Sequence, residues 1–349
     1  MSNQLTIALD AMGGDHAPKS VLKGANIARR RWPDVRFLLF GDEARLKPFL
    51  RRRPRLHKIV SINHTSAAIA PDEKPSVALR SGRDSSMRLA IDAVRDEAAD
   101  GVVSAGNTGA LMAMSKFSLK TLPGIDRPAM ASFFPTIRGE SVMLDLGANV
   151  ECSADNLIQF ALMGEVFART VLGALEPTVG LLNVGSEDLK GNDVVRLAAG
   201  VLREFEHPFN FHGFVEGDDI ALGTVDVVVA DGFSGNIALK TAEGTAKLYT
   251  EFLREAFRNS VMARIGYLFA RRALKKLRAR VDPRRYNGAV FLGLRGISVK
   301  AHGGSDALAF ATAIGVAVDM AKNGFIGQIK SEIERLHETG QAGQQAAAS

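Results

Sequence analysis

The chain has 349 residues, of which 46% are hydrophobic, enough for a large core in one or two domains. Its single cysteine, Cys152, excludes an intramolecular disulfide, as is typical of proteins in a reducing cytoplasm. The N-terminus lacks a signal-peptide pattern, and the longest uncharged apolar stretch, 307–318, is too short to span a bilayer. We therefore expect a soluble protein that at most binds to a membrane surface.

The net charge of +6 is concentrated in one segment. Between Arg258 and Arg285, ten basic residues accompany one acid, Asp282, so this stretch carries +9 and the rest of the chain −3. Such an asymmetry points to an acidic partner or an anionic surface.

Strand-like apolar runs alternate with helical patterns along most of the chain. The expected strands cover residues 5–9, 35–40, 101–104, 142–146, 179–184, 225–230, 290–294 and 297–300. Nearly continuous Val, Ile and Leu in such runs is typical of parallel strands that are buried on both faces. We predict an α/β fold with a largely parallel sheet and helices on both faces. Residues 1–337 are expected to form a single catalytic domain, and the small polar tail, 338–349, to be disordered.

The loop after the first expected strand gathers groups that can bind an anion. Gly13 and Gly14 let backbone amides approach a ligand closely, and Asp10, Asp15 and His16 add titratable side chains. Several later strands also end in Gly with Asn, Ser, Asp or His. Since ligands of open α/β sheets bind beyond the carboxyl ends of the strands, we expect these loops to leave one sheet edge and to converge on one crevice. The alternative is ordinary turns whose polar residues cap helices.

Further candidate ligands lie in four of these later loops. The loop before a helix expected over 111–119 can hold an oxyanion with its amides and side chains, unless Asn107 or Thr108 only caps that helix. Lys190 can supply a positive charge to phosphate, or be a solvated surface lysine. Ser234 is a candidate helix cap, and Asn236 can donate to a substrate oxygen. The candidates in the four loops are Ser104, Gly106, Asn107, Thr108, Gly109, Lys190, Asn192, Asp231, Ser234, Asn236 and His302.

Residues 245–285, which we call the amphipathic segment, have an apolar stripe at helical period and a basic opposite face. The pattern predicts helix over 245–280, as one helix or as two that meet near Ser260 or Gly266. Such a helix can lie in a membrane interface, cover the core, or form part of a dimer. No nucleic-acid-binding motif accompanies it, so we expect no nucleic-acid partner. The candidate contacts with a membrane or an acidic partner are Leu268, Phe269, Arg271, Arg272, Lys275 and Lys276.

Several other chemistries lack their sequence patterns. There is no Walker A motif, no Gly-x-Gly-x-x-Gly after a strand, and no Cys/His cluster with zinc spacing. Cys152 lies in no catalytic-cysteine signature. We therefore predict neither a cofactor nor a metal.

Taken together, these motifs resemble the bacterial PlsX family, the acyl-[acyl-carrier-protein]:phosphate acyltransferases. The resemblance extends from residue 6 to residue 321. It departs at Gly82-Arg83, where the family commonly has paired lysines, so no required lysine is assigned there. The matching motifs are 9–18, 85–87, 104–110, 124–128, 145–149, 182–192, 230–241, 286–289 and 300–306.

The resemblance implies that a fatty acyl group moves from acyl carrier protein to inorganic phosphate, giving acyl phosphate for phospholipid synthesis. It also implies a fold similar to that of isocitrate and isopropylmalate dehydrogenases and of phosphotransacetylases. The expected partners are acyl carrier protein, anionic lipids at the inner face of the membrane, a second copy of the chain, and the downstream acyl-phosphate:glycerol-3-phosphate acyltransferase.

This chemistry suggests roles for the candidate residues. Phosphate is already an anionic nucleophile, so the site needs only to bind it and to stabilise the developing oxyanion. Lys190, Asn107 and the amides of Gly106 and Gly109 are the proposed phosphate ligands. Asn236 or His16 is the proposed donor to the thioester oxygen. The proposed orienting residues, any of which can also be a base, are Asp10, Asp15 and Asp231.

Three other functions stay open. A phosphotransacetylase-like enzyme would use coenzyme A thioesters, and a decarboxylating dehydrogenase on the same fold would need a dinucleotide. A non-catalytic membrane scaffold would have no need of the polar loops.

Overall fold

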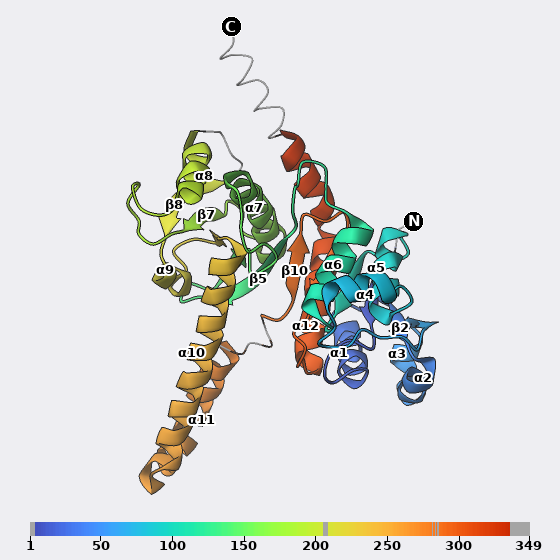
Figure 1. The fold of residues 1–349 in the computed structure, drawn as a ribbon. Helices are drawn as coiled ribbons and strands as arrows, with labels where there is room; N and C mark the ends of the chain where they lie inside the picture. Colours follow the sequence, from blue (N-terminus) through green and yellow to red (C-terminus); the bar gives the residue numbers. More distant parts are fainter. Residues whose placement is uncertain (1–3, 205–208, 281, 283, 285, 336–349) are drawn as a thin grey trace.

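The computed structural model describes residues 4–204, 209–280, 282, 284 and 286–335. Its strands form one eleven-stranded sheet in the order β3-β2-β1-β4-β11-β10-β5-β6-β9-β7-β8 (Figure 1). The strands are β1 (Thr6–Asp10), β2 (Arg36–Gly41), β3 (Val60–His64), β4 (Gly101–Ser104), β5 (Ala129–Pro135), β6 (Glu140–Leu144), β7 (Thr178–Leu182), β8 (Asn210–Val215), β9 (Val227–Val229), β10 (Ala289–Leu292) and β11 (Ile297–Lys300).

Helices cover both faces of this sheet, so the predicted fold class is confirmed. Ile7, Leu9 and Val299 pack toward one face, whereas Ala8 and Val102 pack toward the other. This alternation follows from the two-residue period of a strand. The helices are α1 (Lys19–Arg31), α2 (Glu43–Arg51), α3 (Pro54–His57), α4 (Pro75–Ser81), α5 (Ser86–Arg95), α6 (Thr108–Leu119), α7 (Ala154–Phe167) with its π-helical extension η1 (Ala168–Leu172), α8 (Asp193–Glu204), α9 (Gly217–Leu222), α10 (Gly232–Arg258), α11 (Val261–Arg280) and α12 (Ala307–Lys322).

The sheet is parallel in its two outer parts and antiparallel at its centre. Three consecutive pairings, β11–β10, β10–β5 and β5–β6, are antiparallel. Strands β6, β7, β8 and β9 therefore run opposite to β1, β2, β3, β4 and β11. The expectation that all the polar loops leave one sheet edge is wrong, because those after β6, β7 and β9 start from the other end of the strand array.

Three strands were not expected from the sequence. β3 and β8 lie at the two edges of the sheet and expose part of their polar residues, so neither reads as an apolar run. β5 lies at the centre, but its sequence of Ala, Met, Ser and Phe is not a Val/Ile/Leu run. Length and aliphatic content alone therefore miss both the edge strands and a small-residue central strand.

The sequence left open whether the amphipathic segment forms one helix or two. It folds as two helices, which meet at Asn259 and Ser260. Helix α10 begins earlier than expected, at Gly232, directly after β9. Together α10 and α11 project from the rest of the molecule (Figure 1). The expected tail, 338–349, and residues 281, 283 and 285 of the amphipathic segment lie outside the described residues.

Candidate active site

A buried carboxylate holds the loop that follows β1. Asp10 is 1% exposed and lies at the carboxyl end of the strand. Its Oδ1 accepts hydrogen bonds from the Ser86 hydroxyl at 2.6 Å and from the Gly13 amide at 3.1 Å, and its Oδ2 accepts one from the Ser104 hydroxyl at 2.7 Å. Burial raises the pKa of Asp10, and these hydrogen bonds partly offset the rise. Asp10 thus ties the glycine loop to β4 and α5.

Glycine is required where the β1 and β4 loops meet. A Cβ on Gly13 would lie 2.3 Å from Asp10 Oδ2 and 2.8 Å from the Gly106 amide nitrogen. Gly14 has a φ of +98°, and a Cβ there would lie 2.8 Å from that of Ala105. The two loops therefore pack backbone against backbone, which places exposed Asp15 and His16 at the rim.

Helix α6 starts at Thr108, three residues before the expected start, because Asn107 caps it. The Asn107 Oδ1 accepts from the Ala110 amide at 3.0 Å, and its Nδ2 donates to the carbonyls of Pro71 and Glu73 at 2.9 Å each. The Asn107 side chain is thus fully engaged within the protein. The amides of Thr108 and Gly109 lie in the first helical turn and lack intrahelical acceptors, so they are the groups left to face an anion.

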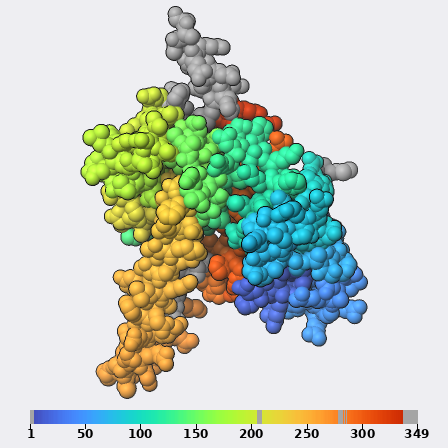
Figure 2. All heavy atoms as spheres, viewed as in Figure 1, coloured from blue at the N-terminus to red at the C-terminus, as the bar shows by residue number. Residues whose placement is uncertain are grey.

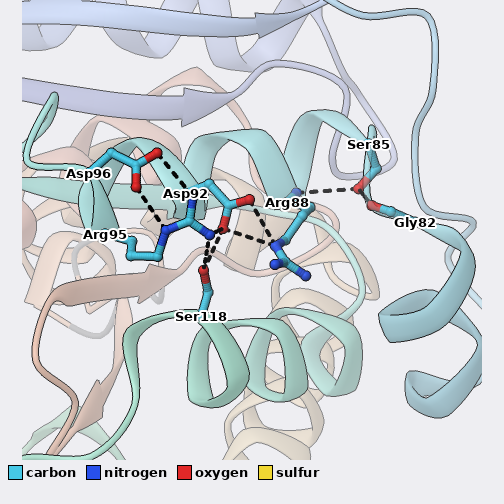
Figure 3. Close-up of polar contacts among 7 residues, drawn as sticks. All are labelled: Gly82, Ser85, Arg88, Asp92, Arg95, Asp96 and Ser118. Carbon is cyan, nitrogen blue, oxygen red and sulfur yellow. Dashed lines mark hydrogen bonds and ion pairs between the residues drawn. The ribbon is translucent and has the colours of Figure 1, made fainter.

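An ion-pair network fixes α5 against α6 (Figure 3). Arg88 Nε contacts Asp92 Oδ1 at 2.9 Å, Arg95 Nη1 contacts the same atom at 2.9 Å, and the Ser118 hydroxyl of α6 donates to it. Ser85 caps α5 by accepting from the Arg88 amide at 3.2 Å. Because Ser86 is the first residue of α5, this network also sets the position of the hydroxyl that binds Asp10.

The β11 loop completes this first group. The Asp15 amide donates to the Gly303 carbonyl at 3.0 Å, and the His302 amide donates to Asn287 Oδ1 at 3.0 Å. Lys300, the last residue of β11, is 7% exposed, and burial lowers the pKa of its ammonium to about 8 despite the nearby charges of Asp15 and Asp10. The sequence predicts no individual role for Lys300 or Ser86. The feature of the sequence that could have indicated Lys300 is that a charged residue ends an otherwise uncharged, buried strand.

A second group lies at the start of α10. Asp231, not Ser234, is the helix cap: its Oδ1 accepts from the Ser234 amide at 2.7 Å and its Oδ2 from the Ser234 hydroxyl at 3.0 Å. A Cβ on Gly147 would lie 3.5 Å from the Asn236 Cβ, so the β6 loop borders Asn236. Asn236 is exposed near the start of α10, and its position is fixed by the Asp231 cap and by the neighbouring β6 loop.

Buried Asp145 organises that β6 loop. Its carboxylate accepts from the Asn149 amide at 2.7 Å, the Met130 amide at 2.9 Å and the Ala148 amide at 3.1 Å. Burial raises the pKa of Asp145, and these donors partly offset the rise. The sequence predicts no role for Asp145 beyond its place in the motif 145–149. In the structure it holds the β6 loop as Asp10 holds the β1 loop.

Lys190 and Asn192 lie in a third group, after β7. The Asn183 side chain donates to the carbonyls of Gly185 at 3.1 Å and Lys190 at 3.2 Å, which closes the loop. Lys190 is exposed, and Asn192 Oδ1 accepts from the Val195 amide at 2.9 Å at the start of α8. Asn192 therefore has a capping contact, while the Lys190 ammonium is available to a ligand.

No hydrogen bond or salt bridge between described residues joins these three groups directly. The molecule is hollowed between α10 and the cyan and blue segments of the N-terminal half (Figure 2). Within the described ranges, no cluster of three or more His, Cys, Asp or Glu side chains is placed to hold a metal ion.

The apolar stripe of the amphipathic segment is exposed. Leu268 is 68% and Phe269 85% exposed, and the basic candidates Arg271, Arg272, Lys275 and Lys276 are exposed as well. Phe257 and Tyr267 pack edge to face with ring centroids 5.4 Å apart, which joins the two helices to each other. The stripe thus does not cover the core of this chain. Among the residues that the structure describes, no helix has the length and apolar content needed to cross a membrane.

Comparison with known proteins gives concordant matches. Residues 5–328 match a family model described as fatty acid synthesis protein. A phosphate acyltransferase of Rhodospirillum centenum is 67% identical over 336 residues, which cover 96% of this chain and 95% of that one. A phosphate acyltransferase of Paramagnetospirillum magneticum is 59% identical, with 96% of both chains covered.

Solved structures share the fold at low sequence identity. A phosphotransacetylase from Streptococcus pyogenes superposes with a TM-score of 0.59 at 16% identity, covering 92% of this chain and 95% of that one. The EutD phosphotransacetylase from Staphylococcus aureus gives a TM-score of 0.56 at 17% identity, covering 92% and 94%. The expected similarity to phosphotransacetylases therefore holds for the fold.

Proposed function

Because the chain belongs to the PlsX family of phosphate acyltransferases and is itself an acyltransferase, we propose that it moves a fatty acyl group from acyl carrier protein to inorganic phosphate. An oxygen of phosphate attacks the thioester carbonyl carbon and forms a C–O bond. The C–S bond then breaks, and the sulfur leaves with the electron pair and takes up a proton as the free thiol. The products are acyl phosphate, for phospholipid synthesis, and free carrier protein.

The observation that carries this proposal is the pairing of an amide-lined loop cluster with buried carboxylates that hold it. Asp10 accepts three hydrogen bonds below 3.2 Å from elements far apart in the sequence, so the glycine loop is preorganised. Preorganised donors stabilise charge that develops during acyl transfer without rearranging. Because the Asp10 and Asp231 carboxylates are engaged with donors, we assign both an orienting role.

We assign the remaining roles by position. The amides of Thr108 and Gly109 at the start of α6 and the exposed Lys190 ammonium are the proposed phosphate ligands. Asn236, or His16 at the rim of the first loop, is the proposed donor to the thioester oxygen. This arrangement requires all three groups to face the same substrate across the hollow beside α10.

The amphipathic segment is proposed to bind an anionic membrane surface. Exposed Leu268 and Phe269 lie near exposed basic residues on a projecting helix, and such a surface inserts its apolar side while the cations attract acidic headgroups. We place the enzyme at the inner face of the cell membrane, where it can pass acyl phosphate to the glycerol-3-phosphate acyltransferase. A second copy of the chain is proposed to cover the rest of the exposed stripe.

The decisive experiment incubates the purified protein with palmitoyl-acyl-carrier-protein, with and without phosphate. Acyl phosphate is trapped with hydroxylamine while the released thiol is counted. Phosphate-dependent release with equal hydroxamate is expected. Release without phosphate would indicate a thioesterase, and faster turnover with palmitoyl-coenzyme A would favour the phosphotransacetylase-like alternative.

A further inference from the structure

We propose that Lys300 is a phosphate-binding residue at the carboxyl ends of β1, β4 and β11. That this phosphate is the reactant, or part of the acyl donor, rests on the proposed function. That Lys300 binds a phosphate group does not. No part in binding or in acyl transfer has been given to Lys300 so far.

Three side chains form a row across neighbouring strands. Lys300 of β11 pairs in register with Ser104 of β4, and the Ser104 hydroxyl donates to Asp10 of β1 at 2.7 Å. Adjacent strands lie about 4.8 Å apart, so an ammonium, a hydroxyl and a carboxylate follow one another along the strand ends. The row lies beside the Gly13 and Gly106 backbones.

The side of the sheet on which Lys300 lies follows from Ser298. The Ser298 hydroxyl is 2.9 Å from that of Ser115 in the middle of α6, and side chains two residues apart share a face of a strand. Lys300 is therefore on the α6 side and two residues nearer the carboxyl end. That position is toward the first turn of α6, where the amides of Thr108 and Gly109 have no intrahelical acceptors.

The Lys300 ammonium is buried without a counter-ion. It donates to the Ala301 carbonyl, and no carboxylate of a described residue lies within salt-bridge distance of it. Asp10 and Asp15 act on it only over a longer range. A lysine ammonium has three donors, so two remain for a ligand. Burying a cation without a partner is costly, and a bound phosphate would supply both the missing charge and the missing acceptors.

The direct test is equilibrium dialysis of the full-length protein against radiolabelled inorganic phosphate. Lys300→Met, which keeps an unbranched side chain up to the Cε position and removes the ammonium, should weaken binding by about tenfold or more. Lys300→Arg should retain most of the affinity, and Lys300→Gln serves as a second neutral variant if the Met variant does not fold. Ser298→Ala, on the same strand face, is the matched control and should bind like wild type.

Kinetics then separate two sources of the phosphate group. If the ligand is the reactant, Lys300→Met raises KM for inorganic phosphate and leaves KM for the acyl donor unchanged. If it is the phosphate of the carrier protein's prosthetic group, KM rises for acyl-phosphopantetheine but not for acyl-pantetheine, and phosphate dialysis is unaffected. Wild-type values for all of these quantities in folded Lys300→Met would overturn the proposal.

The pH dependence gives an independent readout. Wild-type affinity should fall as the pH rises above about 8, where Lys300 loses its proton. Asp15 and Asp10 are the charged groups that act on it. Lys300→Met should lack this fall, and Lys300→Arg should shift it to higher pH. The same fall in wild type and Lys300→Met would contradict the proposal. Wild-type protein that binds phosphate at Lys300 but releases no thiol would instead refute only the proposed function.

Discussion

Asp10 and Ser86 are 76 positions apart in the chain, and a hydrogen bond of 2.6 Å joins the Ser86 hydroxyl to Asp10 Oδ1. The bond connects the end of β1 to the first residue of α5. Through Ser104 and Gly13, the same carboxylate also holds β4 and the glycine loop. One buried acid thus assembles three elements of the candidate site.

Replacing Asp10 should destabilise this assembly. In Asp10→Asn, an amide NH2 would face hydroxyl and amide donors, so at least one buried donor loses its acceptor. We expect the free energy of unfolding to fall by about 1–3 kcal/mol. Urea denaturation should show a lower midpoint with an unchanged slope. The exposed carboxylate Asp34 is the control, and Asp34→Asn should change stability by less than about 0.5 kcal/mol. Equal midpoints for the two variants would contradict the role of Asp10.

Lys190→Ala should impair phosphate use without unfolding the protein. The side chain is exposed and its loop is closed by Asn183, so the fold does not depend on the ammonium. We expect KM for phosphate to rise by about tenfold or more, or turnover to be lost. Lys322→Ala, at the exposed end of α12, is the control. Unchanged phosphate kinetics in the Lys190 variant would remove this residue from the site.

Membrane binding should depend on Leu268 and Phe269. Changing both to Glu places negative charge on an exposed apolar surface, so sedimentation with anionic liposomes should decrease strongly, with normal circular dichroism. The control is a double variant outside the amphipathic segment, Leu175→Glu with Leu197→Glu, at positions that are 91% and 64% exposed. This control should sediment with liposomes like wild type. If both double variants still sediment with liposomes, the stripe is a dimer contact instead, and the Leu268/Phe269 variant should then dissociate in light scattering.

Buried Glu165 should make stability depend on pH. Burial raises its pKa to about 7, above the ordinary value of 4.5, although Arg169 lies 3.0 Å away. Glu165 therefore stays protonated to a higher pH in the folded state than in the unfolded state. Because the folded state binds more protons between about pH 4.5 and about pH 7, the free energy of unfolding falls as the pH rises through this range. Glu165→Gln should remove this fall, which amounts to roughly 1–3 kcal/mol. Glu176→Gln, at an exposed position, should leave the profile unchanged, and identical profiles for all three proteins would refute the prediction.

Cys152 should react slowly with alkylating reagents. Burial raises the pKa of its thiol to about 11, so little thiolate is present at pH 8. Iodoacetamide should label the folded protein about 100-fold more slowly than the urea-unfolded chain, for which a thiol pKa of about 8.5 applies. As the only cysteine, it makes this rate easy to assign. Equal labelling rates would show that the thiol is freely accessible.

The candidate site was predictable where its chemistry is local. Gly13 and Gly14 follow a buried run of apolar residues, so a close-approach loop could be inferred without a structure. Asn107 was correctly considered as a helix cap, since a cap depends on residues three positions away. The candidate cap Ser234 is wrong and Asp231 is the cap, because both residue types cap well and the sequence pattern does not locate the start of α10.

The sequence by itself determined the fold class, the polar strand-end loops and the helical period of the amphipathic segment, because each depends on periodicity and on neighbouring residues. Only the tertiary structure decided that three central pairings are antiparallel, that Asp10 meets Ser86 and Ser104, and that Lys300 is buried beside them without a counter-ion. Strand order and long-range contacts arise from how whole elements pack together, and no local pattern of residues specifies which strand becomes the neighbour of which.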